Sequence, residues 1–146
     1  MRTEIYEFDK EDYEELREVW EKSVRATHDF LQEKDIQNIK EKLFMYFEYV
    51  DIFGMKDEKG KITGFIGMSE DKIEMLFVSP EHFGETIGKR LVKFAVRDMK
   101  VSYVDVNEQN TGGYEFYKKL GASFVSRDKL DSDGNPFPII HLKFTE

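Results

Sequence analysis

The chain has 146 residues and a formal net charge of −8 at pH 7, and this acidic balance argues against a general nucleic-acid surface, which would need a basic face. Hydrophobic residues make up 40% and aromatic residues 14%, which is enough apolar material for a packed core and excludes a disordered chain. There is no cysteine, so disulfides, thiolate metal ligands and cysteine nucleophiles are excluded.

The N-terminal residues 1–6 contain no apolar signal segment, and no apolar run approaches the length of a membrane span. We therefore expect a cytoplasmic protein without a membrane partner. The three histidines, His28, His82 and His141, lie far apart, and no spacing of His, Asp or Glu resembles a metal cage. We therefore expect no metal site.

The first half of the chain predicts a strand, two helices and three further strands. A short strand at residues 5–8 precedes a helix that begins at Tyr13, where the apolar spacing has the period of a helix with one buried face. The residues of that face are Leu16, Val19, Trp20, Ser23 and Val24. A second helix begins near Asp35. Three antiparallel strands separated by polar turns follow at residues 49–56, 62–68 and 73–78.

The second half predicts two more helices and three more strands. One helix starts at Ile87 and ends near Lys100, and a strand at residues 101–106 follows it, which indicates a parallel crossover. A short helix at residues 114–120 ends at Gly121. Closing strands follow at residues 122–127 and 139–144. The sequence therefore predicts one α/β domain over residues 1–146, with a mixed, mostly antiparallel central sheet and helices on both faces.

The stretch from the strand at residues 73–78 into the helix at Ile87 is the most informative one. The strand ends at Pro80, and a loop containing Gly84 leads to a helix whose first turn contains Gly88. Unpaired backbone N–H groups at a helix N-terminus favour an anion, and glycine permits a close approach of the backbone. The alternative is an ordinary strand-to-helix connection.

The order of elements, this loop and residues 116–121 together resemble the GCN5-related N-acetyltransferase (GNAT) superfamily over nearly the whole chain. Residues 23–31, 106–110 and 131–138 are also similar to small bacterial acetyltransferases of the YjaB type. Three separated segments in the correct order are more specific than any one of them. The resemblance implies acetyl-coenzyme A (acetyl-CoA) as co-substrate.

The resemblance also implies a set of cofactor-binding residues. Backbone groups of the central strand would pair with the pantetheine arm and the acetyl carbonyl, namely those of Leu76, Phe77 and Val78. The loop would bind the pyrophosphate through Gly84, Glu85, Thr86, Ile87, Gly88 and Lys89. Asn110 occupies the position of a cofactor-contacting asparagine in the family, and it is equally a candidate helix cap.

The loop departs from the family pattern at two positions. Phe83 stands where the family usually has Arg or Gln, and Thr86 stands where it usually has its first glycine. Phe83 donates no hydrogen bond from its side chain, and Thr86 adds a side chain close to the expected phosphates. These departures predict weaker cofactor binding rather than a lost site, because backbone donors do not depend on side-chain identity.

Acetyl transfer to an amine needs an acid for the leaving thiolate and an acceptor for the amine proton. Tyr117 matches the position of the family's acid, although a tyrosine on a short helix is also a common core residue. Three residues are candidates for the base: Asp105, Glu74 acting through a water, and His28, whose ordinary pKa suits the role. Loss of the proton to solvent, without a dedicated base, remains open.

The sequence therefore predicts an acetyl-CoA-dependent N-acetyltransferase that transfers the acetyl group directly to a small-molecule amine. One alternative is a catalytically weak or inactive module of the same fold that binds acyl-CoA or another ligand as a sensor. Another is a peptide or protein acetyltransferase, which would need an open acceptor groove. The pattern indicates neither the acceptor nor the oligomeric state.

Overall fold

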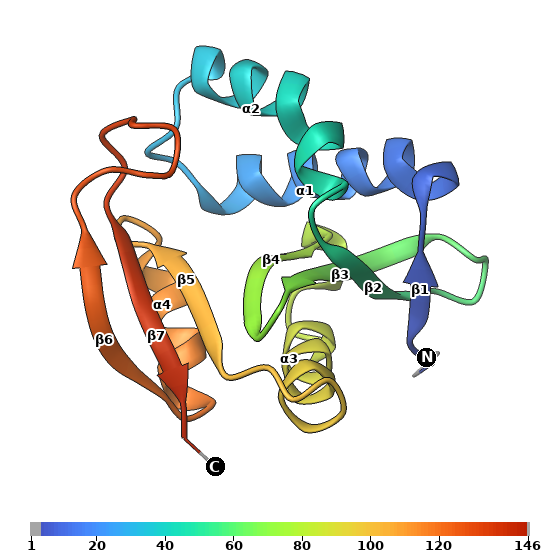
Figure 1. Ribbon diagram of the computed structural model, residues 1–146. Coiled ribbons are helices and arrows are strands. Elements are labelled where there is room, and N and C mark those ends of the chain that lie inside the picture. Colours follow the sequence, from blue (N-terminus) through green and yellow to red (C-terminus); the bar gives the residue numbers. More distant parts are fainter. Residues whose placement is uncertain (1–3, 146) are drawn as a thin grey trace.

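The computed structural model describes residues 4–145, which form one seven-stranded sheet with helices on both faces (Figure 1). The strands are β1 Tyr6–Phe8, β2 Asp51–Lys56, β3 Ile62–Ser69, β4 Lys72–Val78, β5 Tyr103–Asn107, β6 Ala122–Asp128 and β7 Ile139–Phe144. The α-helices are α1 Tyr13–Thr27, α2 Glu33–Phe47, α3 Ile87–Arg97 and α4 Thr111–Lys119. The predicted fold class is confirmed. The stretch 1–3, part of the segment in which we expect no signal peptide, lies outside the described residues.

The strand order in the sheet is β1-β2-β3-β4-β5-β7-β6, and β4 and β5 are its parallel neighbours, as the predicted crossover requires. These two strands pair only at their starts, where Lys72 lies opposite Tyr103 and Ile73 lies opposite Val104. Beyond Ile73 the two strands separate, as Figure 1 shows. The sheet is therefore split on one side of its middle, and the backbone of β4 beyond the split is free of a neighbour there.

Two apolar clusters hold the helices against the sheet. One contains buried residues of α1 and α2 together with residues of β1, β2 and β3, and the other contains buried residues of α3 and α4. The first cluster contains no residue of β5, β6 or β7. On the α1–α2 side, these three strands therefore present a face that no helix covers in the described part of the chain.

The predicted elements agree with the structure apart from their ends. The buried residues of α1 are the five predicted ones, and Trp20 is a core residue. Helix α3 ends at Arg97 rather than near Lys100, and Lys100 has a left-handed backbone with φ of 60°. Strand β5 starts at Tyr103 rather than at residue 101, because the N–H of Val101 bonds the carbonyl of Ala95 at the end of α3.

Candidate active site

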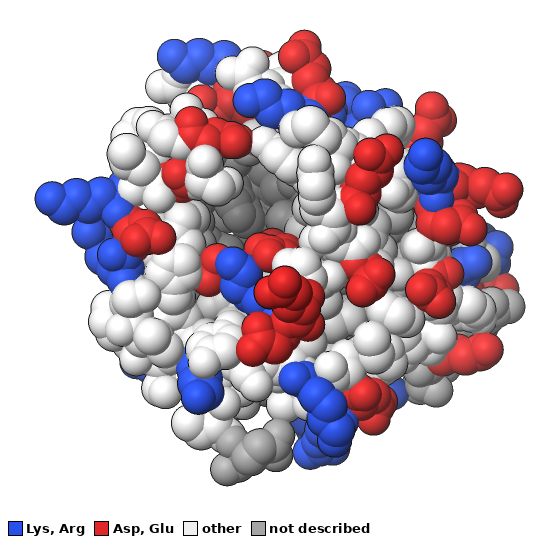
Figure 2. Space-filling model, viewed as in Figure 1, with Lys and Arg blue, Asp and Glu red and all other residues white. Residues whose placement is uncertain are grey.

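A cleft of about 1030 Å³ lies where β4 and β5 separate. Residues of α1, β4, the loop before α3, β5, α4 and the β6–β7 segment line it. Figure 2 shows a hollow in the face of the molecule seen in Figure 1, with acidic side chains around it. Because the cleft opens between elements far apart in the sequence, its lining combines residues from both halves of the chain.

The strand β4 contains a bulge beside the cleft. Ile73 pairs with Met68 and Met75 pairs with Gly67, so Glu74 is an extra residue without a partner of its own on β3. A bulge bends a strand and redirects its side chains. Beyond the bulge, Leu76, Phe77 and Val78 all line the cleft, which places the predicted cofactor strand along it.

The loop before α3 presents a row of free backbone donors. The first helical bond of α3 runs from the N–H of Arg90 to the carbonyl of Thr86. Within residues 4–145, no hydrogen bond is donated by the N–H groups of Gly84, Thr86, Ile87, Gly88 and Lys89. The backbone of Gly84 is left-handed with φ of 86°, and the space where a Cβ would lie is open. Free amides at a helix N-terminus beside open space fit a phosphate group.

The two departures from the family pattern have distinct structural consequences. Phe83 lines the cleft and is 47% exposed. Thr86 is left-handed with φ of 65°, a conformation that a β-branched residue adopts only at a cost and that glycine adopts readily. Its hydroxyl donates to the carbonyl of Glu85 and accepts from Nε of Arg90. Residue 86 therefore has a backbone conformation that suits glycine, although the residue at this position is threonine.

Glu85 lies differently from the other predicted loop residues. Its side chain faces His82, with 3.0 Å between Glu85 Oε1 and His82 Nδ1, and it lines a smaller neighbouring pocket instead of the cleft. Its N–H donates to the carbonyl of His82. The negative charge of Glu85 is therefore directed away from the cleft.

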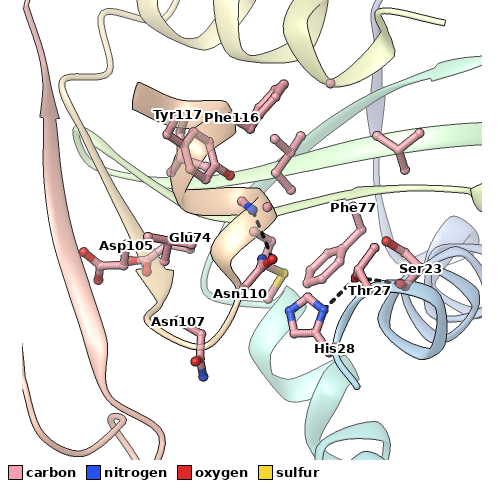
Figure 3. Close-up of a pocket in the computed structure, with 18 of the residues that line it drawn as sticks. Ser23, Thr27, His28, Glu74, Phe77, Asp105, Asn107, Asn110, Phe116 and Tyr117 are labelled. Carbon is pink, nitrogen blue, oxygen red and sulfur yellow. Dashed lines mark hydrogen bonds between the residues drawn. The ribbon is translucent and has the colours of Figure 1, made fainter. Parts of the chain in front are cut away.

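Asn110 caps α4. Its Oδ1 accepts a hydrogen bond from the N–H of Gly113 at 3.0 Å, and it also lines the cleft (Figure 3). This cap explains why α4 begins at Thr111, three residues before the predicted start. A Cβ at Gly113 would lie 2.5 Å from Asn110 Nδ2, so a larger residue there would displace the capping side chain.

Tyr117 lines the cleft from α4 and is 7% exposed. Burial raises the pKa of its phenol above the ordinary value of 10.0. Its ring packs edge-on against those of Phe116 and Phe144, whereas its hydroxyl bonds to no other residue within the described chain. The phenol is therefore protonated at neutral pH, and its proton is available to a group in the cleft.

His28 lies at the end of α1 on the cleft wall, as Figure 3 shows. Burial lowers its pKa, and the charge of Asp29 opposes this shift only in part. The Thr27 hydroxyl donates its proton to the carbonyl of Ser23, so the 2.7 Å contact between Thr27 Oγ1 and His28 Nδ1 needs the proton on Nδ1. In the neutral ring, Nε2 is then the nitrogen that can accept a proton.

Asp105 lies on the opposite side of the cleft from His28, beside Glu74 (Figure 3). One carboxylate oxygen, Oδ2, accepts from Lys72 Nζ at 2.9 Å, and the other, Oδ1, lies 2.6 Å from His141 Nδ1. His141 in turn contacts Asp128. Sequence reasoning missed Lys72, His141 and Asp128. The alternation of apolar and polar residues in β7 indicated that His141 faces away from the core, whereas no local pattern indicated Lys72 of β4 or Asp128 of β6.

Two further findings concern residues 4–145. No group of three or more His, Asp or Glu side chains in that range is arranged to hold a metal ion. No helix there is both long and apolar enough to cross a membrane.

The sequence matches the model of the Acetyltransferase (GNAT) family over residues 3–122. The chain belongs to this family. It is 32% identical over 132 residues to the peptidyl-lysine N-acetyltransferase YjaB of Salmonella typhimurium, covering 90% of this chain and 91% of the relative. It is 31% identical over 134 residues to the protein of the same name from Escherichia coli, covering 92% and 91%.

Solved structures agree with this assignment. The solution structure of apo-form YjaB from Escherichia coli matches with a TM-score of 0.87 at 31% identity, over 97% of each chain. The PaiA N-acetyltransferase of Thermoplasma acidophilum, crystallised in complex with coenzyme A, matches with a TM-score of 0.71 at 26% identity, over 97% of this chain and 98% of that one. The protein is therefore a GNAT acetyltransferase with a YjaB-like fold.

Proposed function

We propose that the protein transfers the acetyl group of acetyl-CoA to the ε-amine of a lysine in a peptide or protein. The observation that carries this proposal is the similarity to two relatives named peptidyl-lysine N-acetyltransferase, which extends over nine-tenths of the chain. The acceptor that we propose differs from the small-molecule amine expected from the sequence and corresponds to the peptide or protein alternative stated there.

Acetyl-CoA supplies a thioester whose acetyl carbon is open to attack by an amine, and the chain's own groups fit its parts. The free amides from Gly84 to Lys89 would bind the diphosphate. Backbone groups of Leu76, Phe77 and Val78 would pair with the extended arm, since β4 has no neighbour at that edge beyond the split. Asn110 would contact the cofactor from the start of α4.

The proton transfers would fall to two side chains on different walls of the cleft. Tyr117 holds a proton on its hydroxyl for the leaving thiolate. His28 is neutral because burial lowers its pKa, and its Nε2 would accept the proton of the acceptor amine. Asp105 is less suited to that role, because both of its oxygens already face donors. We therefore place Asp105 in acceptor binding.

One observation keeps the small-molecule acceptor as a second candidate. The α1–α2 loop and the β6–β7 loop touch beside the cleft, where the rings of Phe30 and Phe137 lie 6.3 Å apart. The hydroxyl of Tyr46 also donates to Asp133 Oδ2 at 2.7 Å, which ties α2 to the β6–β7 loop. This contact restricts access for an extended peptide, whereas a long lysine side chain or a small amine enters more easily.

The test is acetylation of two matched peptides. The protein is mixed with acetyl-CoA and a peptide that has a blocked N-terminus and one lysine. The control is the same blocked peptide with arginine in place of the lysine. We expect one acetyl group on the lysine peptide by mass spectrometry and none on the control. Acetylation of small amines from a panel, but of no lysine peptide, would favour the second candidate. Acetylation of neither kind of acceptor would contradict the proposed acetyltransferase activity.

A further inference from the structure

Four side chains form a row that begins on β4 and continues across the uncovered face of β5, β7 and β6. Lys72 lies on β4, Asp105 on β5, His141 on β7 and Asp128 on β6. Lys72 Nζ is 2.9 Å from Asp105 Oδ2, Asp105 Oδ1 is 2.6 Å from His141 Nδ1, and His141 Nε2 is 2.8 Å from Asp128 Oδ2. All four line the cleft. We call them the charged row.

The geometry of the charged row fixes the protonation state of His141. Both of its ring nitrogens face carboxylate oxygens, and an ionised carboxylate only accepts hydrogen bonds. A neutral imidazole can donate from one nitrogen alone, so both contacts are made only by the imidazolium. Burial by itself lowers the pKa of His141, but the hydrogen bonds to Asp128 and Asp105 outweigh it and raise the pKa above 6.5.

The position of Asp105 depends on these partners. No residue of β5, β6 or β7 belongs to the apolar cluster under α1 and α2, so among the described residues no helix of that cluster packs on the carboxylate. Asp105 and His141 are direct partners in the β5–β7 ladder, and Lys72 approaches the other carboxylate oxygen from β4. Each carboxylate oxygen accepts about two hydrogen bonds, so one site on each oxygen remains free for an incoming N–H.

We infer that His141 is a positioning residue for acceptor binding: as an imidazolium fixed by Asp128, it holds Asp105 Oδ1 so that the carboxylate receives the amine of the acceptor. The inference rests on the proposed function, in which the acceptor enters this end of the cleft. Asp105 contacts the acceptor, whereas His141 acts through Asp105. Asp128 fixes the far side of the imidazole ring and is the most exposed member of the row, with its side chain 67% exposed.

The inference has a pH dependence with a definite sign. As pH rises through the raised pKa of His141, one ring nitrogen loses its proton. The lone pair of that nitrogen then faces a carboxylate oxygen, and the hydrogen bond between them is lost. The groups that face the ring are Asp105 from β5 and Asp128 from β6, with Lys72 of β4 beyond Asp105. On its own strand, Lys143 instead lies 5.5 Å over the ring of Tyr103. Acceptor binding therefore weakens on the alkaline side of the His141 titration.

The first experiment needs no substrate. In the full-length ¹⁵N-labelled protein, we expect the ring nitrogens of His141 to give imidazolium shifts at pH 6.5 and a titration midpoint above that value. Asp105→Asn is expected to lower the midpoint by about one pH unit, because it removes one ionised partner. Lys143→Gln, which removes a positive charge from the same strand outside the cleft, is expected to leave it unchanged. A neutral ring at pH 6.5, or a midpoint that Asp105→Asn does not lower, would overturn the inference.

The second experiment separates positioning from a merely structural role. The KM for a lysine peptide is expected to rise with pH across the His141 titration in the wild type and in Lys143→Gln. In His141→Gln, which can still donate a hydrogen bond but does not titrate, the KM should stay flat. The KM for acetyl-CoA should not change. If the peptide KM of His141→Gln still rises with pH as it does in the wild type, the inference is contradicted.

The two experiments also distinguish this inference from the proposed function. A neutral His141 in an enzyme that acetylates lysine peptides would overturn the inference alone. A protonated His141 in a protein that acetylates no lysine peptide would overturn the proposed function, and with it the role of Asp105 in binding that acceptor.

Discussion

The proposed cofactor end and the proposed acceptor end of the cleft are built from different parts of the polypeptide. At the cofactor end, the donors are backbone N–H groups of the loop from Gly84 to Lys89. At the acceptor end, the groups are charged side chains such as Asp105, His141 and Lys72, held in place by one another. Binding through backbone N–H groups tolerates unusual side chains such as those of Phe83 and Thr86. Binding through side chains changes with each substitution of those side chains. This difference predicts that cofactor binding is robust and acceptor choice is variable.

The largest effect is expected where the two ends meet, at Tyr117. Tyr117→Phe removes the phenolic proton while keeping the ring in its packed position between Phe116 and Phe144. We expect kcat to fall about 100-fold, as for loss of a general acid, with the Kd of acetyl-CoA unchanged. Steady-state kinetics and calorimetry check this, with the thermal unfolding midpoint as the control. An unchanged kcat would show that the proton comes from elsewhere.

A smaller effect is expected at His28, on the acceptor side. The lowered pKa keeps most of the imidazole neutral at pH 6.5, so the activity of the wild type should fall only as pH drops through that lowered pKa. His28→Gln keeps a polar side chain but cannot take up the proton. We expect kcat to fall about tenfold or more and this acidic limb of the pH profile to disappear. If His28→Gln keeps the acidic limb of the pH profile, the titration that causes this limb belongs to another group.

The smallest effect is expected at the cofactor end, at Thr86. Thr86→Gly removes a β-branched side chain from a left-handed backbone, and the relief exceeds the extra chain entropy of glycine. We expect the free energy of unfolding to increase by about 0.5 to 1 kcal/mol and acetyl-CoA to bind slightly more tightly. Urea denaturation and calorimetry measure the two quantities. A less stable variant would show that the contacts of the Thr86 hydroxyl with Glu85 and Arg90 outweigh the strain.

Most of the fold was predictable from sequence, because apolar spacing depends on which residues face the core. The five residues of the buried face of α1 were predicted in this way. Element ends were less accurate, since they depend on caps: Asn110 starts α4 at Thr111, and the bond from Val101 to Ala95 delays β5. The local sequence pattern does not determine which of these contacts form.

The backbone loop of the candidate site and four of its lining side chains, those of His28, Asp105, Asn110 and Tyr117, were predictable from sequence, whereas the partners of Asp105 were not. The loop before α3 follows from strand, glycine and helix in sequence, and its free amides lie where that order places them. The charged row was not predicted, because its members are separated by up to 69 positions and meet only through the pairing of β4 with β5, β5 with β7 and β7 with β6. The separation of β4 from β5 was not predicted either, since apolar spacing says nothing about where two paired strands part.

The most direct test of the account is the response of the loop amides to coenzyme A. In a ¹⁵N-labelled sample titrated with coenzyme A, we expect the backbone signals of Gly84, Thr86, Gly88 and Lys89 to show the largest shifts, because their N–H groups are free to bind the diphosphate. Saturation of the titration with these four signals unmoved would contradict the account, and so would the absence of any shift at millimolar coenzyme A.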